Sequence, residues 1–145
     1  MPATAKDSLG VFSSWAAFRD AEPMRCYAIA QPRRERESEP FASISNWPDR
    51  DVRGQFHLRL SRSVDEGAYV RLRIGSRAFN LAANGHNAWG RDARMDAAIL
   101  AAIRSADVMS VGARGAGGVR FVDRYDLAGA ASAIDAATIG CIVRR

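Results

Sequence analysis

Two stretches of the chain alternate apolar and polar residues with a period of two, and this pattern restricts the fold more than any other feature. Every second side chain is apolar in residues 55–60, and the same holds in residues 70–74, after a turn at 63–67. A strand with this pattern buries one face and leaves the other in water, as is typical of antiparallel sheets. The short connections fit hairpin loops.

The rest of the chain extends this β pattern and adds two helices. Apolar residues recur at helical spacing over 92–106, with Asp92 as the expected N-cap, and a small-residue helix is predicted over 130–138. Because helices do not alternate with strands, a βαβ nucleotide fold is disfavoured. We predict a mostly β fold, an antiparallel β-sandwich or partly closed barrel with two short helices in the C-terminal half. Further strands are predicted at 11–18, 25–30, 41–47, 78–81, 108–111 and 119–125.

The length and composition indicate one globular domain. The chain has 145 residues, of which 48% are hydrophobic and 26% charged, enough to bury a sizeable core. No linker or repeat divides it, so we expect a flexible N-terminus over 1–10 and a single domain over 11–145. No stretch approaches the about 20 apolar residues of a membrane-spanning helix, and a membrane-spanning protein is therefore not expected.

Basic residues on the polar side of the predicted strands are the main candidates for a binding site. The net charge is +5, and Lys6 is the only lysine among 21 basic residues. Arginine forks bind phosphate, sulfate and carboxylate groups bidentately. The alternative is a solvated surface in an arginine-biased protein. The predicted anion-binding face comprises His57, Arg59, Arg71, Arg73 and Arg77.

Other motifs predict no chemistry. The glycine cluster at 112–118 precedes a predicted strand rather than a helix, so a hairpin tip is favoured over a phosphate cradle. Neither His57 nor His86 has a recognisable nucleophile beside it, and no zinc-ligand spacing occurs. The mixed-charge segment 33–39 is interpreted as a solvated loop. We therefore predict no catalytic residue, no metal site and no cofactor. Nucleic acid is disfavoured as a partner, because no recognition helix or aromatic stacking platform accompanies the arginines.

The two cysteines, Cys26 and Cys141, leave two alternatives open. They are either separate buried thiols or one disulfide, which would stabilise the fold by about 4–5 kcal/mol and indicate an oxidising compartment. The N-terminal residues contain no apolar signal core. The protein is therefore either cytosolic or begins near the mature end left by a removed signal peptide.

Nine segments together are similar in order and spacing to a known family. Over residues 10–141 the chain resembles the invasion-associated locus B family of Gram-negative envelope proteins. One departure is that Phe18 and Arg19 stand where many members carry a further cysteine, which limits this chain to one bridge. The segments are Trp15, 25–29, 77–81, 88–92, 96–104, 109–111, 123–129, 133–136 and Cys141.

The resemblance implies a periplasmic or secreted β-sandwich without known catalytic residues, held by a Cys26–Cys141 disulfide. We expect a non-catalytic binding or interaction module for an anionic envelope glycan, lipid or protein, or for a host component. The alternatives are an enzyme or inhibitor acting on an envelope polymer, with His57 or His86 and a carboxylate as acid and base, and a structural envelope protein without a discrete ligand.

Four aromatic residues are expected in the core or at its rim, because aromatic side chains bury the most area per residue. They are Trp15, Phe79, Trp89 and Tyr125.

Overall fold

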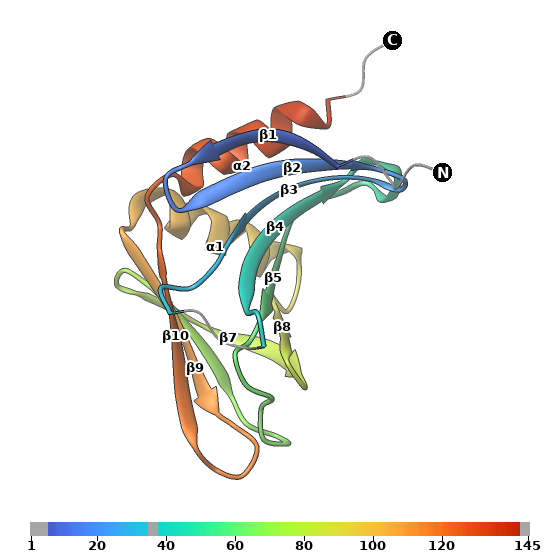
Figure 1. The fold of residues 1–145 in the computed structure, drawn as a ribbon. Helices are drawn as coiled ribbons and strands as arrows, with labels where there is room; N and C mark the ends of the chain where they lie inside the picture. The colour runs from blue at the N-terminus through green and yellow to red at the C-terminus, as the bar shows by residue number, and fades with distance from the viewer. Residues whose placement is uncertain (1–5, 35–37, 143–145) are drawn as a thin grey trace.

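A computed structural model describes residues 6–34 and 38–142, and it consists of one antiparallel sheet of ten strands with two helices (Figure 1). The strand order is β1-β2-β3-β4-β5-β8-β7-β6-β9-β10, and the sheet is not closed. The prediction of a mostly antiparallel β fold with two helices in the C-terminal half is confirmed. The strands are β1 (Lys6–Phe12), β2 (Trp15–Ala21), β3 (Met24–Ala30), β4 (Phe41–Trp47), β5 (Val52–Arg59), β6 (Val70–Ile74), β7 (Arg77–Asn84), β8 (Asn87–Trp89), β9 (Val108–Arg114) and β10 (Arg120–Asp126).

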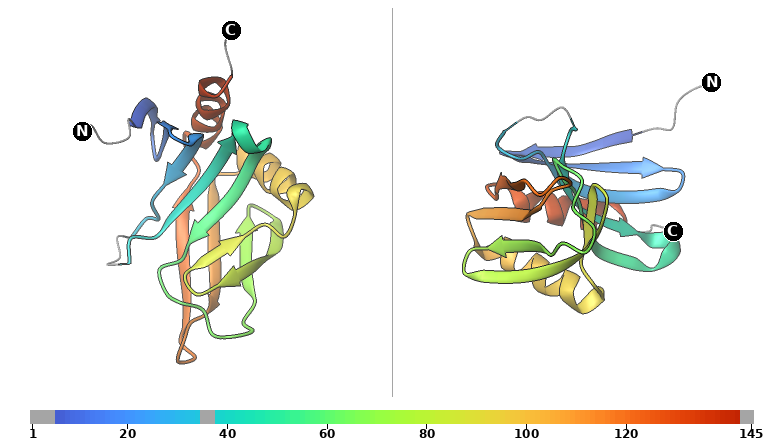
Figure 2. Two further views of the ribbon diagram at one scale, coloured as in Figure 1. Left: turned by 90° about the vertical axis from the view of Figure 1, so that its right-hand side faces the viewer. Right: turned by 90° about the horizontal axis from the view of Figure 1, so that it is seen from below.

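The sheet folds back on itself like a sandwich, with the core between its two halves. The helices are α1 (Ala93–Ser105) and α2 (Ala130–Gly140), and a short 3-10 turn, η1 (Pro48–Arg50), joins β4 to β5. Helix α2 packs on β1, β2 and β3, whereas α1 packs on β5, β6 and α2. Both helices lie toward one end of the molecule, and the β9–β10 hairpin extends away from them (Figure 2).

The period-two stretches form strands with one buried face, as predicted. In β6, Val70, Leu72 and Ile74 are fully or almost fully buried and the two arginines between them are exposed. Phe56 and Leu58 of β5 are equally buried. Successive side chains along a strand point to opposite sides of the sheet, so the residues next to a buried one in the sequence lie on the other side. We call this other side, turned away from the core and from α2, the outward face.

Three of the four predicted core aromatics are buried. Trp15 is 1% exposed, Tyr125 is fully buried and Phe79 is 8% exposed. Trp89 differs, because it is 37% exposed and stands on the outward face of β8, where it pairs with His57.

The start of the chain differs from the expectation of a flexible terminus over 1–10. Residues 6–10 belong to the edge strand β1, which pairs with β2 from Lys6↔Asp20 to Phe12↔Trp15. The predicted strand over 11–18 is therefore divided by a turn, in which Ser13 adopts a left-handed φ of 56°. Residues 1–5, and residues 35–37 of the mixed-charge segment, lie outside the described residues.

The turn between β1 and β2 meets the end of β10 and joins the two halves of the sheet. The Trp15 indole Nε1 donates to the Asp126 carbonyl at 2.9 Å, and the Ser14 N–H donates to the Ala128 carbonyl at 3.2 Å. Next along the chain, Gly129 has a left-handed φ of 89°, and a Cβ there would overlap the Phe12 backbone carbonyl. Glycine is required at this position for both reasons.

A second junction ties α2 to the sheet. Cys26 of β3 is fully buried and forms a disulfide with Cys141 at the end of α2, with the two Cα atoms 5.8 Å apart. Of the alternatives left open by the sequence, the single disulfide is confirmed. Among the described residues, neither helix is long and apolar enough to cross a lipid bilayer.

Replacement of Gly129 by alanine should destabilise the fold more than a matched glycine replacement. Gly117→Ala, at a hairpin position with φ 87° and open space around it, should cost only the left-handed strain of about 1–2 kcal/mol. Gly129→Ala adds the overlap with Phe12, so its free energy of unfolding in urea should fall further. Equal losses in the two variants would contradict the close approach at the junction.

Removal of the disulfide should also lower stability strongly. The bond closes a sequence separation of 115 residues, and the double variant Cys26→Ala, Cys141→Ala should lose about 4–5 kcal/mol in chemical unfolding. Reduction of the wild-type protein should produce a similar loss and leave the double variant unchanged. An unfolding midpoint insensitive to reductant would argue against the bond.

Candidate anion-binding site

The residues of the predicted anion-binding face fall into three groups in the structure. Arg71 and Arg73 stand on the outward face of β6, and His57 and Arg59 stand on the same side of β5. Strands β8 and β7 lie between them, which separates the two pairs by about 14 Å at the usual strand spacing.

Arg77 does not join either pair. It is paired with the core residue Ile74, so its position in the register is on the inward side, at the end of β7. Its guanidinium carbon lies 5.2 Å from the centroid of the Phe79 ring. The structure therefore brings together Arg71 and Arg73, but not the complete set.

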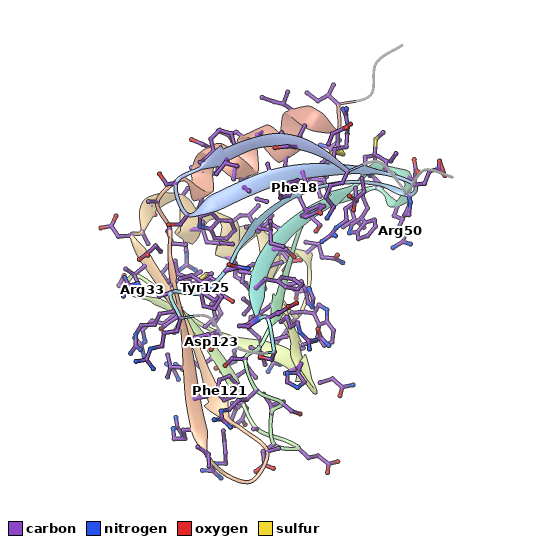
Figure 3. All side chains as sticks on the ribbon, in the orientation of Figure 1. Phe18, Arg33, Arg50, Phe121, Asp123 and Tyr125 are labelled. Atoms are coloured by element: carbon purple, nitrogen blue, oxygen red, sulfur yellow. A yellow bond between two sulfur atoms is a disulfide. The ribbon has the colours of Figure 1, made fainter. Side chains whose placement is uncertain are left out.

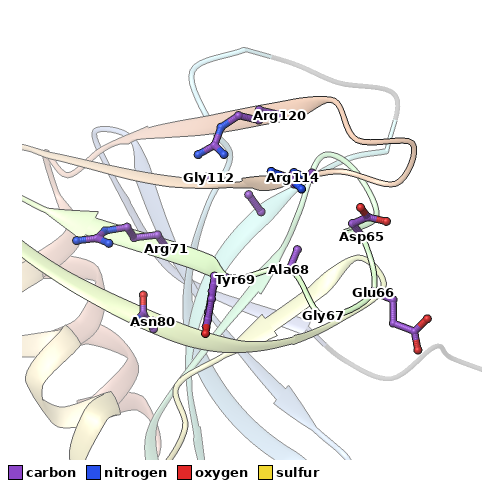
Figure 4. Close-up of a pocket in the computed structure, with 11 residues that line it drawn as sticks. Asp65, Glu66, Gly67, Ala68, Tyr69, Arg71, Asn80, Gly112, Arg114 and Arg120 are labelled. Atoms are coloured by element: carbon purple, nitrogen blue, oxygen red, sulfur yellow. The ribbon is translucent and has the colours of Figure 1, made fainter.

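Arg71 instead shares a surface cavity with two arginines that the sequence analysis did not select. Arg71 of β6, Arg114 of β9 and Arg120 of β10 line a cavity of about 590 Å³. Figure 4 shows Arg71 and Arg120 on either side of Gly112. Together these three arginines are called the arginine cavity residues below. The other lining residues are Asp65, Glu66, Gly67, Ala68, Tyr69, Asn80, Gly112 and Ala113.

The register of the sheet creates this cavity. Arg71 is directly opposite Gly112, and Arg114 is opposite Arg120. A Cβ at Gly112 would lie only 3.3 Å from the Phe121 carbonyl oxygen, which favours glycine at this position. Because glycine has no side chain, the space above it, between Arg71 and Arg120, stays empty. Side chains on either side of a residue without a side chain enclose a hollow on the outward face of the sheet.

The arginine cavity residues have hydrogen-bond donors free to bind a ligand. All three side chains are exposed, and within the described part of the chain none forms an ion pair with a carboxylate within 4 Å. Asp65 and Glu66, on the loop before β6, are the acidic residues among the lining. An unpaired guanidinium can offer two parallel N–H donors to one anionic group.

A second cavity of about 520 Å³ shares Arg120 and lies between β10, the last strand of the sheet, and the segment 32–34, whose Arg33 N–H donates to the Arg124 carbonyl. Its lining includes Arg62, Arg124 and the buried Asp123, whose Oδ2 accepts the Ser61 N–H at 2.9 Å. This bond ties the segment before Arg62 to β10 and so places Arg62 at the cavity. Figure 3 shows Asp123 and Tyr125 on β10 between the two halves of the sheet.

The two histidines are held by neutral groups. His57 Nε2 lies 2.9 Å from Asn87 Oδ1, and His86 Nδ1 lies 3.2 Å from the Leu60 carbonyl oxygen. Burial lowers the pKa of His57 below its ordinary value, and the neighbouring Arg25 and Arg59 act in the same direction. Within residues 6–34 and 38–142 neither histidine hydrogen-bonds a carboxylate, and no group of three or more His, Cys, Asp and Glu side chains is arranged to hold a metal ion.

One carboxyl group away from the arginine cavity has a shifted proton affinity. Asp96, in the first turn of α1, is half-buried against β5, and burial raises its pKa to about 6. The nearby Asp92 carboxylate, which caps α1 by accepting the Met95 N–H at 2.8 Å, raises it further, whereas a hydrogen bond from the Phe56 backbone lowers it. The predicted N-cap of this helix is confirmed.

Asp96 should make the free energy of unfolding fall as the pH rises from about 4 to about 6. Because its pKa is about 6 in the folded protein and 3.8 in the reference state, the folded form binds the proton more tightly, and this contribution is lost as the pH rises through that window. Asp96→Asn should be more stable than wild type at pH 7, by on the order of 1 kcal/mol after solvent screening, and equal to it near pH 4. Urea unfolding at both pH values measures the difference, with the exposed Asp107→Asn as control. An Asp96→Asn advantage that persists at pH 4 would contradict the assignment.

The arginines of the cavity come from β6, β9 and β10, so neither their spacing nor a local motif marks them in the sequence. The available signal was the alternation in 119–125, which places Arg120 and Arg124 on one side of a strand. In comparison with known proteins, no family model, no curated protein and no solved structure matches this chain.

Proposed function

We propose that the protein is a non-catalytic binding module for an anionic ligand and that the arginine cavity residues form its binding site. The observation that carries the proposal is the convergence of Arg71, Arg114 and Arg120 on one cavity without carboxylate partners among the described residues. Charge-assisted hydrogen bonds from such groups are about twice as strong as neutral ones. Binding then involves no change in covalent bonds. An anion replaces the water that hydrogen-bonds the guanidinium groups.

The shape of the site favours an extended ligand with more than one charged group. The two cavities meet at Arg120, so a ligand with two anionic groups can occupy both. Tyr69, which is 76% exposed at the first cavity, offers an apolar ring to the uncharged part of such a ligand. Phosphorylated or carboxylated glycans, lipid headgroups and acidic protein segments share this chemistry.

We further propose that the protein works outside the cytosol, in the periplasm or secreted, and that it belongs to the invasion-associated locus B family. The Cys26–Cys141 disulfide supports the location, because such bonds persist in oxidising compartments. The family proposal is supported by the resemblance in the order and spacing of its segments. An anionic component of the bacterial envelope is the ligand class that fits both the proposed location and the proposed family.

Binding of inorganic tripolyphosphate, followed by titration calorimetry, tests the proposed site. The double variant Arg71→Gln, Arg120→Gln should lose about 100-fold in affinity, since each charge-assisted hydrogen bond contributes about 1.5–3 kcal/mol. Raising the salt concentration from about 0.1 M to about 1 M should weaken the wild-type complex, because the screening length falls from about 10 Å to about 3 Å.

The matched control removes the same charge elsewhere. Arg53 and Arg94 are exposed, lie near the start of α1 and do not line either arginine cavity. Arg53→Gln, Arg94→Gln should retain wild-type affinity apart from a small general loss. Equal losses in the two double variants would show attraction by net charge alone and would contradict a specific site.

A further inference from the structure

Cationic and aromatic side chains alternate in a row across the outward face of the first half of the sheet. In order they are Lys6, Tyr27, Arg25, Trp47 and Arg50, and we call this row the cation–aromatic ladder. The Lys6 Nζ lies 5.6 Å from the Tyr27 ring centroid, and the Arg25 guanidinium carbon lies 3.9 Å from the same centroid. Arg25 and Arg50 then lie 5.2 Å and 4.8 Å from the centroid of the Trp47 ring.

Further rings continue this surface toward β8. The His57 and Trp89 rings are stacked with centroids 6.1 Å apart, and Phe41 meets His57 edge-on at 5.6 Å. On the other side Phe18 is beside Tyr27, with ring centroids 5.8 Å apart. Figure 3 shows Phe18 beneath β2 and Arg50 farther to the right, near the turn that joins β4 to β5.

The register places these residues on one side of the sheet. Phe18 is paired with Tyr27, and His57 is paired with Trp89. The alternate positions of β2 and β3, including Cys26, point toward α2 and the core. No α-helix packs on the ladder side among the described elements. Tyr27 is nevertheless only 3% exposed, because Lys6, Arg25 and Phe18 lie against its ring, so Lys6, Arg50 and Trp89 are the groups of this face that are open to solvent.

The cations of this face are held by rings and neutral groups. Arg25 is half-buried, donates from Nε and Nη2 to Ser45 Oγ, and forms no ion pair among the described residues. Asp20 is the acidic residue whose charge acts on both Arg25 and Lys6. Arg59 donates from Nε to the Ser38 carbonyl at 2.9 Å. Lys6 and Arg50 are exposed and form no ion pair among the described residues, so the positive charge open to an external anion is theirs.

We infer that this face binds single-stranded nucleic acid, with bases stacking on Trp89 and on the guanidinium plane of Arg50 while Lys6 and the N–H groups of Arg50 contact phosphates. Proteins that bind single strands without sequence preference combine stacking rings with a basic surface. Bases also stack on arginine planes. A duplex keeps its base faces stacked inside the double helix, so single strands are favoured.

This inference reverses the expectation that nucleic acid is disfavoured, which rested on the lack of both a recognition helix and an aromatic stacking platform in the sequence. The platform consists of residues from β1, β2, β3, β4, β5 and β8 and from η1, so only the fold brings them together. It is separate from the arginine cavity residues, since β7 lies between β8 and β6. It therefore does not rest on the proposed function.

A short oligothymidylate, titrated while tryptophan fluorescence is recorded, tests the inference. Trp15 is buried, so quenching on binding would report Trp47 and Trp89. Trp89→Ala should weaken binding about tenfold, because stacking one base is worth about 1–3 kcal/mol. Arg50→Gln should reduce the slope of log affinity against log salt concentration by about one.

The controls separate this face from the arginine cavity. Because the quenching reports Trp47 and Trp89 and not the arginine cavity, Arg71→Gln, Arg120→Gln should leave the affinity measured by quenching within about twofold of wild type, even though oligothymidylate phosphates also suit the cavity. Circular dichroism should show that the Trp89→Ala protein is folded. Three results would overturn the inference: an affinity for oligothymidylate that Trp89→Ala does not change, equal binding of duplex DNA, or tighter, Trp89-dependent binding of an acidic polysaccharide such as polygalacturonate. The last result would assign the face to glycans.

Discussion

The structure depends on the meeting of two distant backbones, where the β1–β2 turn contacts the end of β10. The apolar side of this open ten-stranded sheet is buried by its facing half together with α1 and α2, and this contact holds the two halves in position. Trp15 contributes to this junction in two ways. Its ring is buried in the core, and its indole N–H donates a hydrogen bond to the Asp126 carbonyl. Gly129 allows the approach, and the disulfide fixes α2 over the same half of the sheet.

Once the core side is fixed, the register determines which residues emerge on the outward face. On β6, β9 and β10 it exposes arginines around Gly112, where the absence of a side chain leaves a hollow with unpaired donors. On β3 and β4 it places the buried Tyr27 ring and the half-buried Trp47 ring against the guanidinium groups of Arg25 and Arg50. Arginine thus occurs in two environments on this face: around a cavity, and with its guanidinium group stacked on an aromatic ring.

Local patterns predicted much of the fold. The alternation in 55–60 and 70–74, the Asp92 cap and the glycine-rich hairpin each follow from interactions within a few residues. The order of strands could not be predicted in this way. Strand β8 has three residues and no periodic signal, yet it pairs with β5 and so keeps His57 away from Arg71.

The candidate sites were less predictable because they are long-range. Arg71 was selected from its strand pattern, but its cavity partners Arg114 and Arg120 come from a hairpin whose glycines suggested only a turn. Trp89 was expected near the core, and its outward position follows from the pairing of β8 with β5 and β7. Register and strand order across the whole sheet determine both results.

Mapping the amide shifts of the protein by NMR during a tripolyphosphate titration would test the central claim, that the register of the sheet builds a specific anion site, most directly. The account predicts saturable shifts clustered at Tyr69, Arg71, Gly112, Arg114 and Arg120, on three strands that are adjacent in the sheet. Shifts spread evenly over exposed arginines such as Arg53 and Arg94, without saturation, would contradict it.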